Sequence, residues 1–187
     1  MKKAHHALFP LLLAMSVTGH AADDRVTMIY EAAATDEVPA VLAGACTLSI
    51  GAISDERNNK ESVSADFGRV LSGDPVPWLG TAFDSLAAYG YKVVKGDKPA
   101  RGGIVMHAAI KRSYVYHGPM RLNGVVALDT VLTLPSGEKL SRKYRASGSK
   151  TNMASMNSEY MTTLNYALNG LLGKMSADLE SICKRTG

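Results

Sequence analysis

The stretch "SMNSEYMTTLNYALNGLLGKMSADLESICK", residues 155–184, carries the strongest structural signal of the chain. Its large apolar residues recur at steps of three and four, which places them along one stripe of an α-helix. The residues of this stripe are Met156, Tyr160, Leu164, Leu168, Leu171, Leu172, Met175, Leu179 and Ile182. A helix with one apolar stripe needs an apolar surface to cover it. We therefore predict a long C-terminal helix that packs on a sheet.

Three strand patterns directly precede this helix, at residues 104–117 ("IVMHAAIKRSYVYH"), 120–134 ("MRLNGVVALDTVLTL") and 139–149 ("KLSRKYRASGS"). The tight turn "PSGE" separates the last two, and all three are predicted as consecutive antiparallel strands, with a bulge at Gly124. In the last strand an apolar-rich set of residues alternates with a polar set, which predicts a sheet face open to water. That polar set is Ser141, Lys143, Arg145 and Ser147.

The first half of the domain contributes fewer elements. Residues 46–53 ("CTLSIGAI") alternate as a strand, residues 78–90 ("WLGTAFDSLAAYG") show one apolar helical stripe that Gly90 ends, and residues 91–96 ("YKVVKG") form a short strand. The predicted order is β-α-β-β-β-β-α. This is an α+β fold with a mostly antiparallel β-sheet and two amphipathic helices. The economical arrangement places both helices on one face of the sheet. The alternative places them on opposite faces.

The N-terminus predicts export. Lys2 and Lys3 precede an apolar run of residues 7–17, and Gly19 and Ala21 are the small residues of a cleavage site, so residues 1–21 are predicted to be a signal peptide. The apolar run is shorter than the ~20 residues that span a bilayer, and no transmembrane span is predicted. The remaining boundaries are an irregular lead-in at 22–45 and a single α+β domain at 46–187. The predicted location is the periplasm, with peripheral outer-membrane association as an extension.

The stretch "VLAGAC", residues 41–46, resembles the box at which bacterial lipoproteins are cut and lipidated. A large aliphatic residue is expected three positions before the cysteine, where this chain has Ala43, and acidic residues lie upstream. We therefore expect no lipid on Cys46. Cys46 and Cys183 are the only cysteines, and in an oxidising compartment such a pair is expected to form a disulfide; two free thiols are the alternative. The bridge requires the last helix to run antiparallel to the first strand.

Charge is concentrated in the middle of the chain, where residues 101–150 contain nine Lys/Arg and two Asp/Glu. Nucleic acid is not an expected partner of an exported protein. An anionic envelope polymer, anionic lipid headgroups or an envelope protein are the candidate partners. The residues predicted to contact an anionic surface are Lys139, Arg142, Lys143 and Arg145. The alternative is that these residues are merely the solvated faces of strands.

Motifs for chemistry are weak. Ser147 and Lys150 have the S-x-x-K spacing, but this serine is predicted to end a strand, whereas an acylating serine opens a helix. His107 and His117 lack metal-ligand spacing, and "DER" at 55–57 is predicted to be a solvated turn. We therefore predict no catalytic, cofactor-binding or metal-binding residues, no cofactor, and a protein that is not an enzyme.

Three segments carry a family resemblance: "SDERN" at 54–58, "LAAYGYKV" at 86–93 and "LNYALNGLLGKMSADL" at 164–179. Together they resemble the YajG-type family of bacterial envelope lipoproteins over roughly residues 46–184. The resemblance implies a small α+β domain tethered to the outer membrane, without assigned catalysis. This chain differs from the family because it lacks the lipidated cysteine.

The functional hypothesis is a non-enzymatic periplasmic accessory or interaction protein of the cell envelope, in which exposed strands could add a partner at an edge. A second hypothesis is a small-molecule or lipid-binding protein with its ligand between the methionine-rich helix and the sheet. A third is a hydrolase, which would need a cleft that joins His107 or His117 to a serine and a carboxylate.

Overall fold

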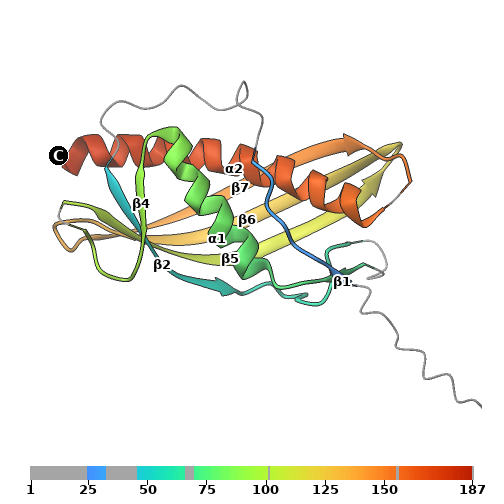
Figure 1. Ribbon diagram of the computed structural model, residues 1–187, viewed down its shortest axis with the longest axis horizontal. Helices are drawn as coiled ribbons and strands as arrows, with labels where there is room; N and C mark the ends of the chain where they lie inside the picture. The colour runs from blue at the N-terminus through green and yellow to red at the C-terminus, as the bar shows by residue number, and fades with distance from the viewer. Residues whose placement is uncertain (1–24, 33–45, 66–69, 101, 155, 187) are drawn as a thin grey trace, which may run out of the picture.

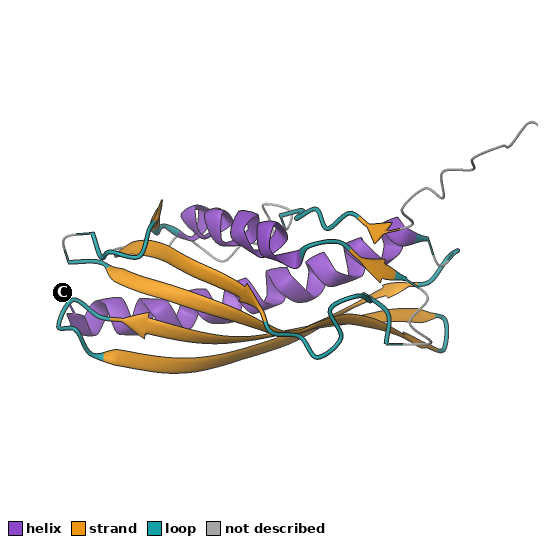
Figure 2. Ribbon diagram, turned by 90° about the horizontal axis from the view of Figure 1, so that it is seen from below, coloured by secondary structure: helices purple, strands orange, loops and turns teal. Residues whose placement is uncertain are grey.

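The computed structural model describes residues 25–32, 46–65, 70–100, 102–154 and 156–186. A five-stranded sheet in the order β4-β2-β5-β6-β7 forms one layer, and both helices form the second layer on one side of it (Figures 1 and 2). The elements of this body are β2 (Thr47–Asp55), α1 (Pro75–Asp84), the 3₁₀-helix η2 (Ser85–Tyr89), β4 (Lys92–Lys95), β5 (Ile104–Gly118), β6 (Arg121–Thr133), β7 (Lys139–Thr151) and α2 (Asn157–Thr186). Two further short strands, β1 (Arg25–Val26) and β3 (Leu71–Ser72), pair with each other in parallel.

The α+β class, the order of the main elements and the long helix on the sheet are confirmed, and both helices share one face. The prediction of a mostly antiparallel sheet needs correction, because the sheet is mixed. Strand β2 pairs in parallel with β4 on one side and with β5 on the other, whereas β5–β6 and β6–β7 are antiparallel. The alternation that predicts a strand does not reveal the direction of its neighbour.

The loop at 96–103 explains the parallel pairs. It returns the chain from the end of β4 to the start of β5 by crossing the side of β2 that the helices leave open. The N–H of Gly96 donates to the carbonyl of Ile50, and the N–H of Ala100 donates to the hydroxyl of Ser49. The crossing covers one end of this sheet face, so Ser49 is fully buried although it points away from the helices.

Helix α2 crosses the sheet where two glycines lie side by side. Gly124 of β6 and Gly148 of β7 are register partners. A Cβ atom at Gly148 would lie 2.5 Å from the backbone nitrogen of Ala167, and one at Gly124 would lie 2.6 Å from the carbonyl oxygen of Thr163. The pair therefore allows the helix backbone to approach the strands. The predicted bulge at Gly124 is wrong: the register shift lies in β5, between Ile110 and Arg112.

The two helices are joined through a buried amide. Asn165 of α2 is 2% exposed, and its Oδ1 accepts a hydrogen bond of 2.9 Å from the indole N–H of Trp78 in α1. Its Nδ2 donates to the carbonyl of Ile29 at 3.0 Å. One side chain of α2 therefore satisfies a polar group of α1 and one of the N-terminal segment, as buried polar groups require.

Part of the expected lead-in belongs to the folded body. Residues 25–32 include β1 and then run alongside α2, where the hydroxyl of Tyr30 donates to Asn169 at 2.6 Å. Val26 is buried in the core. The remainder of the lead-in at 33–45 and the predicted signal peptide lie outside the described residues, and their boundaries stay predictions.

Candidate functional site

The helices cover one face of the sheet, and the other face is open over β5, β6 and β7; we call it the outer face. On β6 the residues at even positions from Leu122 to Leu132 point toward the helices and are buried. The residues at odd positions, such as Ala127 and Val131, point to the outer face. Figure 2 shows this face on the side of the sheet away from both helices. An uncovered face of an antiparallel sheet is expected to be polar.

Three cationic side chains gather on this face: Arg112, Lys143 and Arg145, which we call the basic cluster. Arg112 and Arg145 are both aligned with Ala127, which lies between them on β6. The strand spacing sets the backbones of these two arginines about 10 Å apart. No hydrogen bond or ion pair within the described chain engages the three cationic head groups. Asp129, register partner of Lys143, is the acidic residue that borders the cluster.

The four basic residues predicted to form an anionic contact do not share one surface. Lys143 and Arg145 lie in the basic cluster, and Lys139 lies on the same face but about 20 Å along the strand from Arg145. Arg142 points to the opposite face, where its Nε donates to the carboxylate of Asp178 in α2 at 3.1 Å. The strand period of two separates it from its neighbours. In place of Arg142, the basic cluster contains Arg112. Its position next to the cluster follows from the pairing of β5 with β6.

Arg142 belongs to a polar contact that holds α2. The carboxylate of Asp178 also accepts a hydrogen bond of 2.7 Å from the hydroxyl of Tyr144. Burial, and then this hydrogen bond to a carboxylate, raise the pKa of Tyr144, so the phenol stays protonated as the donor. This contact therefore attaches the helix to β7, and Arg142 has a structural role in it.

One shallow depression lies on the outer face, and a second adjoins it at β5, beside the segment at 57–65. One of about 230 Å³ lies within the basic cluster, and one of about 310 Å³ lies beside it. Arg112 borders both. The second is polar, and its lining includes Asn58, Asn59, Ser62 and Tyr114. Cations next to amides, hydroxyls and an aromatic ring are suited to an extended ligand that carries both acid and hydroxyl groups.

The residues tested for catalysis do not converge within the described structure. Ser147 faces outward on β7, whereas Lys150 lies on the opposite face and contacts Glu159. His107 points to the outer face, and its Nδ1 accepts a hydrogen bond from the backbone N–H of Ala52. His117 points to the helix face and contacts the hydroxyl of Tyr160. The described residues contain no cluster of three or more potential metal-ligating side chains.

The predicted solvated turn at "DER" is wrong. Arg57 is 4% exposed, and its guanidinium binds Asp55 through both carboxylate oxygens. The same guanidinium donates to the carbonyl of Lys60 and to the hydroxyl of Ser72. A buried cation satisfied in this way has a structural role: it holds the connection between β2 and β3.

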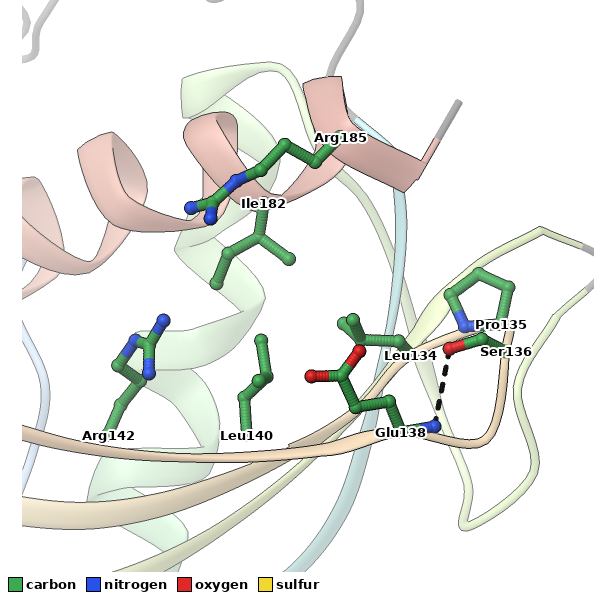
Figure 3. Close-up of a pocket in the computed structure, with 8 residues that line it drawn as sticks. All are labelled: Leu134, Pro135, Ser136, Glu138, Leu140, Arg142, Ile182 and Arg185. Carbon is green, nitrogen blue, oxygen red and sulfur yellow. Dashed lines mark hydrogen bonds between the residues drawn. The ribbon is translucent and has the colours of Figure 1, made fainter.

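A separate groove of about 430 Å³ lies between the last turns of α2 and the β6–β7 hairpin (Figure 3). Leu140 and Ile182 face each other across it. Arg142 and Arg185 flank it, and Glu138 projects toward its centre. Nearer the middle of α2 the helix stripe is closed, because Leu168, Leu171, Leu172 and Met175 are fully buried. The ligand position hypothesised between helix and sheet is therefore filled at its centre and open at this end.

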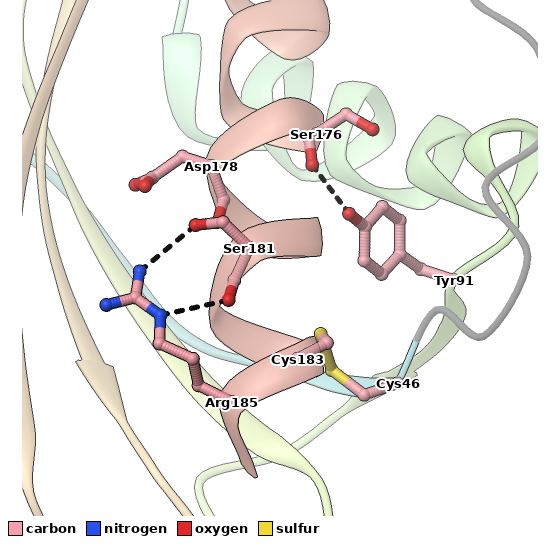
Figure 4. Close-up of a disulfide and its surroundings, with 7 residues drawn as sticks. All are labelled: Cys46, Tyr91, Ser176, Asp178, Ser181, Cys183 and Arg185. Atoms are coloured by element: carbon pink, nitrogen blue, oxygen red, sulfur yellow. Dashed lines mark hydrogen bonds between the residues drawn. A yellow bond between two sulfur atoms is a disulfide. The ribbon is translucent and has the colours of Figure 1, made fainter. Parts of the chain in front are cut away.

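The same end of α2 carries the disulfide (Figure 4). Cys46 and Cys183 are bonded, with Cα atoms 5.7 Å apart, so the predicted pairing is confirmed. The bridge attaches the end of the helix to the start of β2, and the hydroxyl of Tyr91 adds a 2.7 Å bond to the carbonyl of Ser176. No helix among the described residues is long and apolar enough to cross a membrane.

Comparisons with known proteins identify a fold. No protein-family model matches the chain, and no curated protein matches it. The structure is similar to that of protein XCC0632 from Xanthomonas campestris, of the family DUF330, with a TM-score of 0.56 and 12% identity over 87% of this chain and 94% of that one. A minor lipoprotein from Acinetobacter baumannii matches with a TM-score of 0.42 and 12% identity over 75% of this chain and 96% of that one.

The similarity to the Xanthomonas protein, at this low identity, shows a shared fold and nothing about activity. The similarity to the minor lipoprotein is too weak to carry an argument. The narrower resemblance to the YajG-type family therefore stays a prediction.

Proposed function

We propose that this protein is a non-enzymatic binding module of the bacterial envelope, and that its outer sheet face binds an anionic envelope polymer through the basic cluster. The ligand class that fits is a chain with repeated carboxylates or phosphates and hydroxyl groups. The acid groups would contact Arg112, Lys143 and Arg145. The hydroxyl groups would meet the amides and Tyr114 of the adjoining depression.

Arg112 is the observation that carries this proposal. Lysines and arginines on an edge strand such as β7 have a second explanation, because charges there prevent pairing with other chains. Arg112 lies on β5, two strands away from the β7 edge and just beyond the last β2–β5 pair, Asp55–Ile110, so protection of the β7 edge does not explain it. It is exposed, has no ion pair within the described chain, and faces Arg145 across Ala127. An uncompensated cation at this place is accounted for by a ligand.

The test is binding to a defined carboxylate polymer, polygalacturonate, at low ionic strength. The variant Arg112→Gln/Lys143→Gln/Arg145→Gln is expected to bind about tenfold more weakly than the native protein, since exposed charge contacts each contribute modestly. The matched control Lys92→Gln/Lys95→Gln/Lys98→Gln removes the same charge at the other edge of the sheet, and we expect it to bind like the native protein. Equal loss in both variants would reduce the effect to net charge and contradict a site.

Export is part of the proposal. The disulfide supports an oxidising compartment. The intact mass of the native protein is expected to correspond to a chain that begins near Ala22 and carries no lipid. A mass that shows acyl chains on Cys46 would contradict this and would place the protein among lipoproteins.

The groove of Figure 3 supports a second candidate, a small amphiphile with an acidic headgroup. Leu140 and Ile182 would contact the apolar part, and Arg185 would contact the acid. A fluorescent fatty acid is a suitable probe. Binding that is abolished by Leu140→Trp, which fills the groove, and retained by Val131→Trp on the outer face would favour this candidate. Equal binding by the two variants would exclude the groove.

A further inference from the structure

The three exposed methionines of the described chain lie at one end of the molecule, and we call them the methionine tip. Met120 is 81% exposed, Met153 is 80% exposed and Met156 is 56% exposed. Met120 is in the β5–β6 hairpin, and the other two are in the connection from β7 to α2. These two segments meet at the right-hand end of Figure 1. A cluster of exposed apolar side chains indicates a contact surface, whereas isolated ones are ordinary.

Hydrogen bonds hold the two segments of the tip together. The backbone N–H of Asn152 donates to the carbonyl of Met120 at 3.0 Å. Glu159, which is 4% exposed, accepts from the backbone N–H groups of Met153 and Met156 at 3.0 and 3.2 Å. The backbone is therefore fixed beneath the methionines, and their side chains project from a supported base.

Met120 occupies a position that its side chain does not favour. It follows Pro119 in the hairpin turn. Its φ of 57° is positive, and among the described residues it is the only one other than glycine with a positive φ. Glycine or asparagine fits such a turn position better. A methionine at this position gains no packing, because it is almost fully exposed. An unfavourable backbone conformation that no packing contact offsets is typical of functional positions.

The charges around the tip select its partner. Residues 118–123 and 150–158 contain no Asp or Glu, and they include Arg121 and Lys150. Glu159 is the nearest acid along the chain, and its charge is used by backbone donors and by Lys150. A projecting apolar tip with Arg121 at its base and no acidic residue in its two segments suits a surface that is apolar inside and anionic at its boundary. A phospholipid membrane has this structure.

The N-terminal segment emerges at the same end. A depression at the start of α2 is lined by residues of this segment, Arg25, Val26, Thr27, Ile29 and Glu31, together with Asn157, Ser158, Met161 and Thr162. Ile29 in this segment is 61% exposed and adds apolar surface there. The first described residues therefore lie beside the start of α2, which directly follows Met156.

We propose that the methionine tip inserts into the headgroup boundary of a phospholipid membrane, with Met120, Met153 and Met156 as the inserted side chains. The protein would then attach to the membrane by one end, while the outer face stays accessible to other ligands. This inference is independent of polymer binding by the basic cluster.

The test uses the native protein and vesicles of phosphatidylethanolamine and phosphatidylglycerol, with co-sedimentation as the measurement. The variant Met120→Gly/Met153→Ser/Met156→Ser is expected to bind at least about tenfold more weakly, because burial of a single large apolar side chain corresponds to about that factor. The control Val131→Ser/Tyr166→Ser removes exposed apolar side chains elsewhere and should bind like the native protein. Equal binding by the native protein and the methionine variant would overturn the proposal.

Methionine oxidation gives a second readout that reports position. Hydrogen peroxide should convert the three exposed methionines to sulfoxides in the free protein and spare the buried Met106 and Met175. Vesicles are expected to slow oxidation at Met120, Met153 and Met156 severalfold. Unchanged rates in the presence of vesicles would contradict insertion. Met120→Gly alone should leave thermal stability unchanged or raise it, which separates a binding role from a structural one.

Salt distinguishes this inference from the proposed function. Apolar insertion persists at high ionic strength, whereas contacts of the basic cluster are screened. The variant Arg112→Gln/Lys143→Gln/Arg145→Gln should therefore keep its salt-resistant vesicle binding. Vesicle binding that is abolished by salt would show headgroup attraction alone and would overturn insertion.

Discussion

The two faces of strands β6 and β7 are built from alternate residues of the same segments, yet the two faces have different roles. On the covered face, Gly124 and Gly148 admit the helix backbone, and Tyr144 and Arg142 bind its Asp178. On the outer face, the cationic head groups of Lys143 and Arg145 have no hydrogen-bond or ion-pair partner within the described chain. The comparison teaches that neighbouring basic residues can have opposite roles, which the strand period decides. After the disulfide, each prediction below compares a change on the covered side with a matched change elsewhere.

The largest effect is expected from the disulfide, which attaches the covering helix to β2. Its two cysteines are 137 residues apart, and closing so long a loop stabilises the folded state by about 5 kcal/mol in the chain-entropy account. Cys46→Ala/Cys183→Ala should lower the free energy of unfolding by about this amount, measured by urea denaturation, and keep the circular dichroism spectrum. A native-like stability in this variant would contradict the role of the bridge.

Gly148→Ala should be next in size. The added methyl group would meet the backbone of Ala167 and force the helix away from the sheet, at a cost of about 3 kcal/mol. Ser147→Ala, one residue away on the outer face, should change the free energy of unfolding by less than about 0.5 kcal/mol. Similar losses in both variants would show that the faces do not differ as described.

Asn165→Ala should cost about 2 kcal/mol, because it leaves the buried indole N–H of Trp78 without its partner and removes the bond to the carbonyl of Ile29. The control is Asn123→Ala, an amide on the outer face of β6. It should be nearly neutral in the same denaturation experiment. A neutral Asn165→Ala would mean that water replaces the amide and that the helices do not depend on it.

Glu159 should produce a pH dependence. Hydrogen bonds from backbone N–H groups, that of Ala154 first, lower its pKa to about 2 from 4.5, against the effect of burial. Because the folded-state pKa is the lower one, this stabilisation is complete above pH 4.5 and is lost as the pH falls toward 2. The melting temperature of Glu159→Gln should therefore lack the part of the acid-induced decrease that comes from protonation of Glu159. Asp129→Asn on the outer face should retain it; an identical acid profile for Glu159→Gln and the native protein would refute the account.

Periodic elements could be predicted from the sequence, and long-range pairing could not. The stripe from Tyr160 to Ile182 and the alternation at 139–149 predict α2, β7 and the separation of Arg142 from Lys143. The direction of β2 depends on the crossing at 96–103, which no local pattern encodes. Arg112 joins Arg145 only because β6 places Ala127 between them. Arg57 looks solvated in sequence because its burial depends on how the connection between β2 and β3 folds over it, which no local pattern encodes.

The disulfide was predictable because the chain has two cysteines and a helix that must return to the first strand. The methionine tip was not predictable. Met156 belongs to the apolar stripe by spacing. The helix begins at Asn157, however, so Met156 lies outside it and is exposed. Exposure at a helix end depends on where the sheet stops, and this is a property of the assembled fold.

The most direct test of the division between the two faces is a titration of the isotope-labelled protein with polygalacturonate at low salt, followed by amide chemical shifts in NMR spectra. We predict the largest shifts at Arg112, Ala127 and Arg145, with small changes at Leu140 and Ile182 in the groove. These shifts should weaken steeply as the ionic strength rises. Shifts confined to the groove, or no shifts at low salt, would contradict the assignment of binding to the outer face.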